Sequence, residues 1–392
     1  MNGGFFQQLR WKWSLARTGM GFQEEYLERI YRIYLNHNKV VHYRDGHPVR
    51  SLTTPAVLSK PAAHFMARAL YKSIQNRSLP NMLSFAVNDG CNAFCQHCSF
   101  FQGVEEKGRP VLTTEQAQKL VRDAQELGVS VINFVGGEPL LRQDLPQILQ
   151  AVDKDLSATL LVTNGSLLAE RARELRKSGL DSVFVSIDSA DPAKHDLFRR
   201  TKGLFAKATQ GIHIAKTVGL SVGISCTLTP ESFQAGELER LIELGRTLGV
   251  HEVLVFDAMP SGRYQTRKDL VDNWGWVEQV IAAAGPYNED PRYPGVLTWA
   301  YLSSYRSVGC GCGTSYFYVS PYGDVMSCDF NHAKFGSVLQ APLYQIWDHL
   351  SSQEGFCRAK WGGCKVKDSA YLGKPTVVIG APEGVTSVTA RR

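Results

Sequence analysis

The chain has 392 residues, of which 44% are hydrophobic and 20% are charged, an ordinary composition for a globular protein with a sizeable core. It contains no run of about 18 apolar residues, so we expect no transmembrane helix. The basic N-terminus also lacks the apolar core and the cleavage site of a signal peptide. We therefore expect a cytoplasmic protein whose nine cysteines stay reduced.

The net charge of +6 is concentrated at the N-terminal end. Residues 1–80 carry twelve Lys and Arg against four Asp and Glu, which leaves −2 for the remainder. Phe6, Leu9 and Trp13 share one helical face, so this segment either lies on a membrane surface or, as we favour, packs against its own domain. A basic region can also be a solvated face. We expect peripheral membrane contact as a possible role, and we do not expect nucleic acid as a partner.

The first 80 residues read as a mainly helical extension. Residues 21–36 and 62–75 have helical periodicity. Between them, residues 40–50 predict a hairpin, because the Asp45-Gly46 pair favours a tight turn.

From Pro80 onward, strands and helices alternate. Residues 113–127 predict one of the helices, with a capping box of Thr113 and Gln116 at its start and Gly128 at its end. Six such strands separated by helices predict an α/β fold with a parallel sheet or barrel. The predicted strands are Leu83–Asp89, Ser130–Val135, Ala158–Thr163, Ser182–Asp188, Ser221–Leu228 and His251–Ala258.

Directly after the first predicted strand stands Cys91-Asn-Ala-Phe-Cys95-Gln-His-Cys98, with the spacing CxxxCxxC. Three thiolates can hold three irons of a [4Fe–4S] cluster and leave the fourth iron open. Structural zinc is a poorer interpretation, because it usually needs four ligands in CxxC pairs. A disulfide framework would suit a small secreted domain. The loop lies at the carboxyl end of the sheet, where active sites of such folds gather.

A glycine-rich turn, Gly136-Gly137-Glu138-Pro139, follows the second predicted strand. Glycines let the backbone approach a ligand, and a carboxylate can accept a hydrogen bond from an ammonium group. Such turns are common after strands, so alone this signal is weak. Its place about forty residues after the cysteines gives it weight.

Together these motifs resemble those of the radical S-adenosylmethionine (radical SAM) enzymes. That family has the pattern CxxxCxΦC with an aromatic Φ, whose place His97 takes here, and a flat imidazole can still stack on adenine. The family's GGEP motif, which Gly136, Gly137 and Glu138 match, holds the amino group of SAM. By position, Ser186, Asp188 and Arg199 match the residues that contact the SAM ribose and carboxylate.

Two of these positions also have ordinary structural interpretations. Asp188 could instead cap a helix, and Arg199 could be a surface charge. The resemblance covers residues 83–260. It implies a partial (β/α)6 radical SAM barrel in which Cys91, Cys95 and Cys98 hold a SAM-binding [4Fe–4S] cluster. One electron from that cluster would cleave SAM to a 5′-deoxyadenosyl radical, which abstracts hydrogen from a substrate.

A second cysteine group follows a Pro-rich stretch near residue 290. Its turn at Pro321–Asp324 would bring flanking cysteines together. This region resembles the SPASM/Twitch auxiliary domains, which implies a small α+β C-terminal domain with a second, auxiliary [4Fe–4S] cluster. Five cysteines compete for four places, and the pattern favours Cys310 over Cys312; four thiolates also suit zinc. The predicted ligands are Cys310, Cys328, Cys357 and Cys364.

The one cysteine outside these two groups, Cys226, lies within a predicted strand and is expected to be a core residue. The alternative is a thiol that returns a hydrogen atom to a substrate radical. Ser225 and Thr227 lie on the opposite face of that strand and are better candidates for the barrel lumen.

We accordingly predict a helical basic extension (1–80), a radical SAM core (81–265), a linker (266–300), a Twitch/SPASM-like domain (301–375) and a tail (376–392). The first expected substrate is a peptide or protein side chain, and the alternative is a lipid or other small molecule at a membrane surface. A flavodoxin or ferredoxin is the expected electron donor. A non-catalytic iron–sulfur or zinc scaffold is the alternative of another class.

Overall fold

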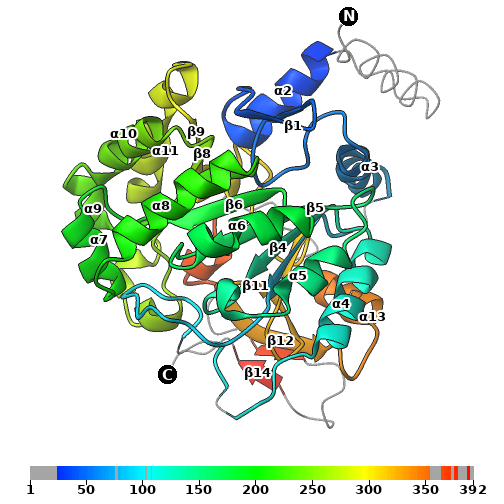
Figure 1. The fold of residues 1–392 in the computed structure, drawn as a ribbon. Coiled ribbons are helices and arrows are strands. Elements are labelled where there is room, and N and C mark those ends of the chain that lie inside the picture. Colours follow the sequence, from blue (N-terminus) through cyan, green and yellow to red (C-terminus); the bar gives the residue numbers. More distant parts are fainter. Residues whose placement is uncertain are drawn as a thin grey trace, which may run out of the picture.

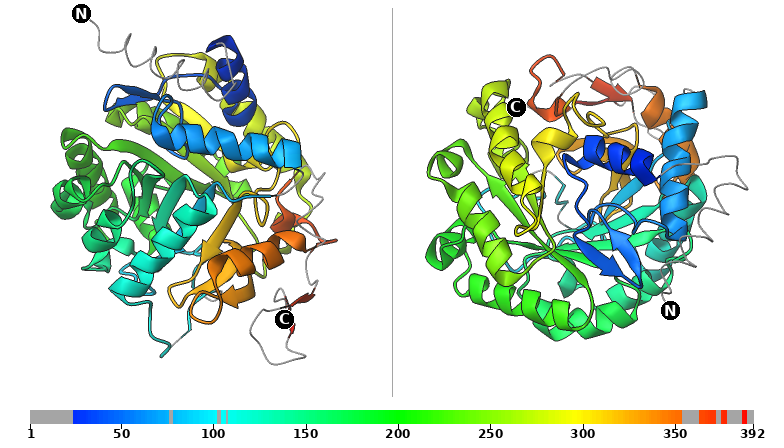
Figure 2. Two further views of the ribbon diagram at one scale, coloured as in Figure 1. Left: turned by 90° about the vertical axis from the view of Figure 1, so that its right-hand side faces the viewer. Right: turned by 90° about the horizontal axis from the view of Figure 1, so that it is seen from above.

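The computed structural model describes residues 24–75, 78–101, 104–106, 108–353, 363–371, 375–377 and 386–388. Its centre is a ten-stranded sheet with the order β12-β11-β10-β3-β4-β5-β6-β7-β8-β9 (Figure 1). Helices surround the sheet on its outer side (Figures 1 and 2). The architecture is the predicted α/β fold with a mostly parallel sheet.

The six predicted strands form the middle of the sheet in sequence order, and each is parallel to the next. Their carboxyl ends therefore meet at one edge, which places the loops that follow them side by side. The strands are β3 (Met82–Ala86), β4 (Val131–Val135), β5 (Ala158–Thr163), β6 (Ser182–Ser186), β7 (Ser221–Leu228) and β8 (Glu252–Asp257).

The C-terminal region continues this sheet. Strand β10 (Tyr316–Val319) pairs in parallel with β3, and β11 (Asp324–Cys328) and β12 (Asn331–Ser337) follow as an antiparallel meander. The predicted turn over residues 321–324 joins β10 to β11. The second cysteine group thus comes from strands that are hydrogen-bonded to the strand before the first cysteine loop.

Residues 266–300 contain regular elements where we expected a linker. Helix α11 (Trp274–Glu289) continues through Pro286, and β9 (Gly295–Thr298) pairs in parallel with β8. The Pro- and Gly-rich composition was misleading because the helix accommodates its proline and β9 lies at the edge of the sheet. The segment extends the barrel.

The helices bury apolar faces against the outer side of the sheet. Helix α4 (Thr114–Leu127) shows the predicted pattern, with its capping box at Thr113 and a left-handed C-cap at Gly128. The other helices after β3 are α5 (Leu145–Gln150), α6 (Leu168–Lys177), α7 (Pro192–Arg199), α8 (Leu204–Thr217), α9 (Pro230–Gln234), α10 (Glu237–Leu248), α12 (Trp299–Leu302) and α13 (Leu343–Ser352). A small hairpin of β13 (Pro375–Val377) and β14 (Thr386–Val388) follows.

The N-terminal elements lie across the end of the barrel opposite the cysteine loop. They are α2 (Glu24–Leu35), the hairpin of β1 (His42–Arg44) and β2 (His47–Val49), and α3 (Lys60–Gln75). Figure 2 shows α2 and the hairpin, in blue, over the centre of the ring of helices. Their apolar side chains form one buried cluster with side chains from β5, β6, β8 and β9.

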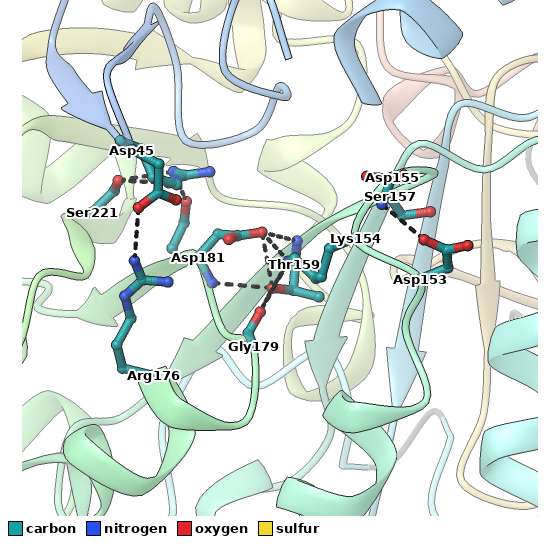
Figure 3. A network of polar contacts seen from close by, with 12 residues as sticks. Asp45, Asp153, Lys154, Asp155, Ser157, Thr159, Arg176, Gly179, Asp181 and Ser221 are labelled. Atoms are coloured by element: carbon teal, nitrogen blue, oxygen red, sulfur yellow. Dashed lines mark hydrogen bonds and ion pairs between the residues drawn. The ribbon is translucent and has the colours of Figure 1, made fainter. Parts of the chain in front are cut away.

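Polar contacts fix the hairpin to the amino ends of the strands. The buried guanidinium of Arg44 donates to the hydroxyls of Ser182 and Ser221, at 2.6 and 2.8 Å. Asp45 pairs with Arg176 at 3.3 Å, and nearby Asp181 accepts from the amide of Thr159 (Figure 3). The extension therefore closes the amino-terminal end of the barrel.

A buried carboxylate holds the segment after the hairpin. Glu252, at the start of β8, accepts from the Leu52 amide at 2.8 Å and the Ser51 hydroxyl at 3.1 Å. Burial raises the pKa of Glu252 to about 7. The next residue, Thr53, reaches the interior and lines the cavity described below.

Within the described ranges, none of the helices is long and apolar enough to cross a bilayer. The basic, aromatic segment that contains Phe6, Leu9 and Trp13 lies outside the described residues. Its peripheral membrane contact therefore stays a prediction.

Candidate active site

One cavity of about 270 Å³ opens inside the barrel at the carboxyl ends of the strands. All ten residues that the sequence assigns to the core cluster and to SAM line it. They are Cys91, Cys95, His97, Cys98, Gly136, Gly137, Glu138, Ser186, Asp188 and Arg199. None of the described auxiliary cysteines does so, which separates the two predicted iron–sulfur sites in space.

Each sulfur of the cysteine loop accepts a hydrogen bond. The amide of Ala93 donates to Cys91 Sγ at 3.4 Å, and the amide of Phe101 donates to Cys98 Sγ at 3.5 Å. Arg199 Nη1 lies 3.7 Å from Cys95 Sγ. Such donors stabilise thiolates and tune the clusters that thiolates hold, so the loop fits a [4Fe–4S] cluster.

Burial acts against ionisation of these cysteines in the free protein. It raises the pKa of the Cys91 thiol to about 12 and also raises the pKa of the Cys95 thiol. Assembly of a cluster must therefore displace protons that the buried thiols would otherwise keep.

The glycine turn is interlocked with the start of the cysteine loop. The amides of Gly137 and Glu138 donate to the carbonyls of Asn88 and Gly90, at 3.1 and 2.7 Å. A Cβ on Gly137 would meet the Gly90 carbonyl oxygen at 2.2 Å, and Gly136 has a φ of +146°. Only glycines let the two segments approach this closely.

The carboxylate of Glu138 is engaged by the protein itself. It accepts from the Thr163 hydroxyl at 2.6 Å, the Asn164 amide at 2.8 Å and the Leu140 amide at 3.0 Å. Glu138 thus ties the end of β4 to the end of β5. Its direct contact with SAM stays a prediction. No partner is recorded for the carbonyls of Gly136 and Gly137 among the described residues, so these are the freer acceptors for an amino group.

Asp188 and Arg199 form a buried ion pair, with Arg199 Nε 2.6 Å from Asp188 Oδ2 and side chains 8% and 2% exposed respectively. Asp188 also accepts from the amide of Thr227 at 2.9 Å. Asp188 is not the helix cap that the sequence allowed, since Asp191 caps α7. Arg199 is not a surface charge, since its side chain is buried. Despite its burial, Asp188 has its pKa lowered to about 2 by Arg199 and nearby histidines.

His97 and Ser186 complete the wall. The His97 ring stacks on Phe198, with centroids 4.8 Å apart and planes at 12°. Burial lowers the pKa of His97 to about 4, so its imidazole is neutral. Ser186 lies 3.2 Å from Ser225 between the hydroxyl oxygens. Their roles toward adenine and ribose stay predictions.

Cys226 is buried in the hydrophobic core, and it also lines the cavity together with Ser225 and Thr227. Its alternative role as a thiol that returns a hydrogen atom to a substrate radical therefore stays a prediction. Residues after β8 also support the cysteine loop, which the sequence did not reveal. The amide of Arg263 donates to the Cys98 carbonyl at 3.0 Å, and its guanidinium donates to the Cys95 carbonyl at 2.7 Å.

Four buried cysteines gather at the second site: Cys310, Cys312, Cys328 and Cys364. Cys312 interacts with the sulfurs of both Cys310 and Cys328. That contact and the amide of Lys365 hold the pKa of the Cys310 thiol below its usual value. These contacts make Cys312 a candidate ligand of the auxiliary cluster, whereas the sequence pattern had favoured Cys310 over it. Cys357 lies outside the described residues, and the choice of four ligands stays a prediction.

Cys328 is already surrounded by donors, since the amides of Phe330 and Asn331 approach its sulfur to 3.4 and 3.3 Å. In the part of the chain that the structure describes, no three His, Cys, Asp or Glu side chains are grouped as a single metal ion requires.

Two family models match the chain. The radical SAM superfamily model matches residues 86–245, and the SPASM model, described as an iron–sulfur cluster-binding domain, matches residues 310–367. Both ranges lie inside the predicted core and C-terminal domain, whose outer boundaries stay predictions.

Curated relatives agree with these matches. The chain is 25% identical to the AdoMet-dependent heme synthase of Methanosarcina barkeri, over 75% of this chain and 93% of the relative. It is 31% identical to the GTP 3′,8-cyclase of Petrotoga mobilis, over 54% of this chain and 70% of the relative. It is also 27% identical to the Fe-coproporphyrin III synthase of Methanosarcina barkeri, over 67% of this chain and 72% of the relative.

Among solved structures, Streptococcus suis SuiB bound to the precursor peptide SuiA superposes with a TM-score of 0.58 at 18% identity, covering 86% of this chain and 77% of SuiB. At that identity the likeness concerns the fold. The chain belongs to the radical SAM superfamily and has a C-terminal SPASM iron–sulfur domain. It is therefore an enzyme with a SAM-binding [4Fe–4S] cluster and an auxiliary iron–sulfur cluster, which excludes the non-catalytic scaffold.

Proposed function

We propose that this radical SAM enzyme abstracts hydrogen from a side chain of a peptide or protein. When bound, the cluster and SAM supply a 5′-deoxyadenosyl radical to the barrel lumen. The observation that carries the proposal is the size of the cavity. Its volume of about 270 Å³ is near the lower end of small-molecule sites, and SAM must share it. A cavity of this size cannot enclose a whole large substrate beside SAM, which favours a substrate that presents one side chain and keeps its remainder outside.

The chain's own residues would hold and orient SAM. Cys91, Cys95 and Cys98 would hold the cluster, and the carbonyls of Gly136 and Gly137 would accept from the amino group of SAM. The Asp188–Arg199 pair presents a fixed guanidinium beside them, suited to the carboxylate of SAM.

His97 would face the adenine and Ser186 the ribose. The N-terminal elements close the opposite end of the barrel, and this keeps water from the reacting atoms.

The charge of the cavity lining supports the same proposal. Arg199 is the one Arg or Lys among the described residues that line the cavity, and Asp188 pairs with it. A substrate with several phosphates or carboxylates would find no free cation there. This distinguishes the cavity from what GTP or an iron coproporphyrin would need.

An assay of 5′-deoxyadenosine tests the substrate class. Reconstituted enzyme is given SAM, a reductant and, separately, a library of seven-residue peptides, GTP or Fe-coproporphyrin III. The proposal predicts that a subset of peptides accelerates 5′-deoxyadenosine formation. Acceleration by GTP or Fe-coproporphyrin III alone would contradict it. We further propose that a flavodoxin or ferredoxin supplies the electron, which replacement of dithionite by each reduced protein would test.

A further inference from the structure

A hydrogen-bonded chain of side chains runs along the wall of the cavity from the radical SAM core to the auxiliary domain. Asn133 Nδ2 donates to Ser84 Oγ at 3.3 Å, and Ser84 Oγ donates to Asp329 Oδ1 at 2.9 Å. The hydroxyl of Tyr316 donates to Asp329 Oδ2. Asn133, Tyr316 and Asp329 line the cavity. None of these residues has a role in the proposed binding of SAM.

Two acceptors in this hydrogen-bonded series, the Asp329 carboxylate and the Asn133 carbonyl oxygen, have no cationic partner among the described residues. The partners recorded for the Asp329 carboxylate are two hydroxyls and no Arg or Lys, within the described residues. Asn133 Oδ1 is buried and has no partner. The orientation of the Asn133 amide follows from Ser84. The Ser84 hydroxyl donates its proton to Asp329, so it must accept from the Nδ2 of Asn133. A half-buried carboxylate without a counter-ion and a buried carbonyl oxygen without a donor are costly unless a ligand completes them.

Aromatic rings form the neighbouring wall. Phe256, Trp299 and Phe330 line the same cavity, with centroids 5.4 to 6.4 Å apart in all three pairs. The faces of such rings attract cations, most strongly where water is excluded. The other buried acid at this end, Asp257, is already paired with Lys367.

From this arrangement we propose that the cavity binds a primary ammonium group of the substrate, with Asp329 and Asn133 as its acceptors and Phe256, Trp299 and Phe330 around its alkyl stem. An ammonium group has three N–H donors, which matches the carboxylate and the orphaned carbonyl oxygen. The inference rests on the proposed function, since it names the substrate side chain as lysine-like. Asp329 and Asn133 would determine specificity.

The test uses n-butylammonium, which equals the lysine side chain beyond Cα, as a probe of the reconstituted enzyme with SAM. Its dissociation constant is compared with those of 1-butanol, pentanoate and n-butylguanidinium by calorimetry. We expect n-butylammonium to bind at least about tenfold tighter than each of the others, because removing one partner of a buried charge pair commonly costs more than this.

Asp329→Asn should bring the ratio of n-butylammonium to 1-butanol affinity close to one, and Asn133→Leu should lower it. Glu239→Gln, which removes an exposed carboxylate from α10, is the matched control and should keep the ratio. Because Asp329 adjoins Cys328, auxiliary iron is measured in each variant. If Asp329→Asn loses iron, Asn133→Leu decides the question.

Equal affinity for n-butylammonium and 1-butanol in the wild-type enzyme would overturn the inference, as would a ratio that survives both substitutions. Binding of the guanidinium as tight as that of the ammonium would overturn the choice of a primary amine. The binding ratio does not depend on turnover, so its failure is distinguishable from failure of the peptide assay.

Discussion

Replacement of Gly137 by alanine probes the contact between the glycine turn and the cysteine loop. The added Cβ would lie 2.2 Å from the Gly90 carbonyl oxygen and 2.6 Å from its carbon, and both neighbours are backbone atoms. Side-chain rotation cannot relieve this overlap, so the two loops must separate by about 0.8 Å or more to reach a normal contact.

Such overpacking typically costs about 1–3 kcal/mol in the free energy of unfolding, which a fold of this size tolerates. The effect on chemistry should be larger, because a misplacement of about 1 Å near reacting groups can cost about 100-fold in rate. We expect Gly137→Ala to fold but to form 5′-deoxyadenosine at least about 100-fold more slowly.

The assay follows 5′-deoxyadenosine after anaerobic reduction, alongside core-site iron and the unfolding midpoint. Gly275→Ala is the matched control, because a Cβ there meets nothing within 4 Å and lies in α11. It should keep the wild-type rate. A wild-type rate in Gly137→Ala would refute the close packing of the two loops.

The remaining predictions concern the auxiliary site and Glu252 at the amino-terminal end of the barrel. Anaerobic reconstitution should give about eight irons per chain, and about four irons with bound zinc would contradict a second [4Fe–4S] cluster. Cys312→Ala should lose auxiliary iron, and full retention would make Cys312 the spare cysteine. Glu252 has its pKa raised from near 4.5 to about 7, so the stability it contributes is full below pH 4.5 and is lost as the pH rises through 7. Glu252→Gln should flatten the pH dependence of the unfolding midpoint in that window, and an unchanged slope would refute this role.

The local elements were predictable because they depend on nearby residues. Strands such as β5 (Ala158–Thr163) and β7 (Ser221–Leu228) have the predicted bounds, since short runs rich in Val, Ile, Leu and Thr mark strands. The cysteine loop and the glycine turn were recognisable by spacing, and the parallel order of β3 and β4 then brought them together.

Long-range contacts were not predictable from local patterns. Nothing in the sequence near Thr53 or Trp299 indicates that either lines the cavity. Thr53 comes from the N-terminal segment that covers the amino-terminal end of the barrel, and Trp299 begins α12, directly after the edge strand β9. Cys312 was set aside on motif spacing, whereas its sulfur contacts depend on how β10 and β11 fold. Asp329 carried one signal, its position directly after Cys328.

The most direct test of the account is the amount of 5′-deoxyadenosine and methionine formed by reduced, reconstituted enzyme with SAM. We expect equal amounts of both products from the wild-type enzyme and neither from Cys95→Ala, since the loop then lacks a third thiolate. Circular dichroism and auxiliary iron of the variant should match the wild-type enzyme. Undiminished 5′-deoxyadenosine from folded Cys95→Ala would contradict the assignment of this loop as the SAM-cleaving site.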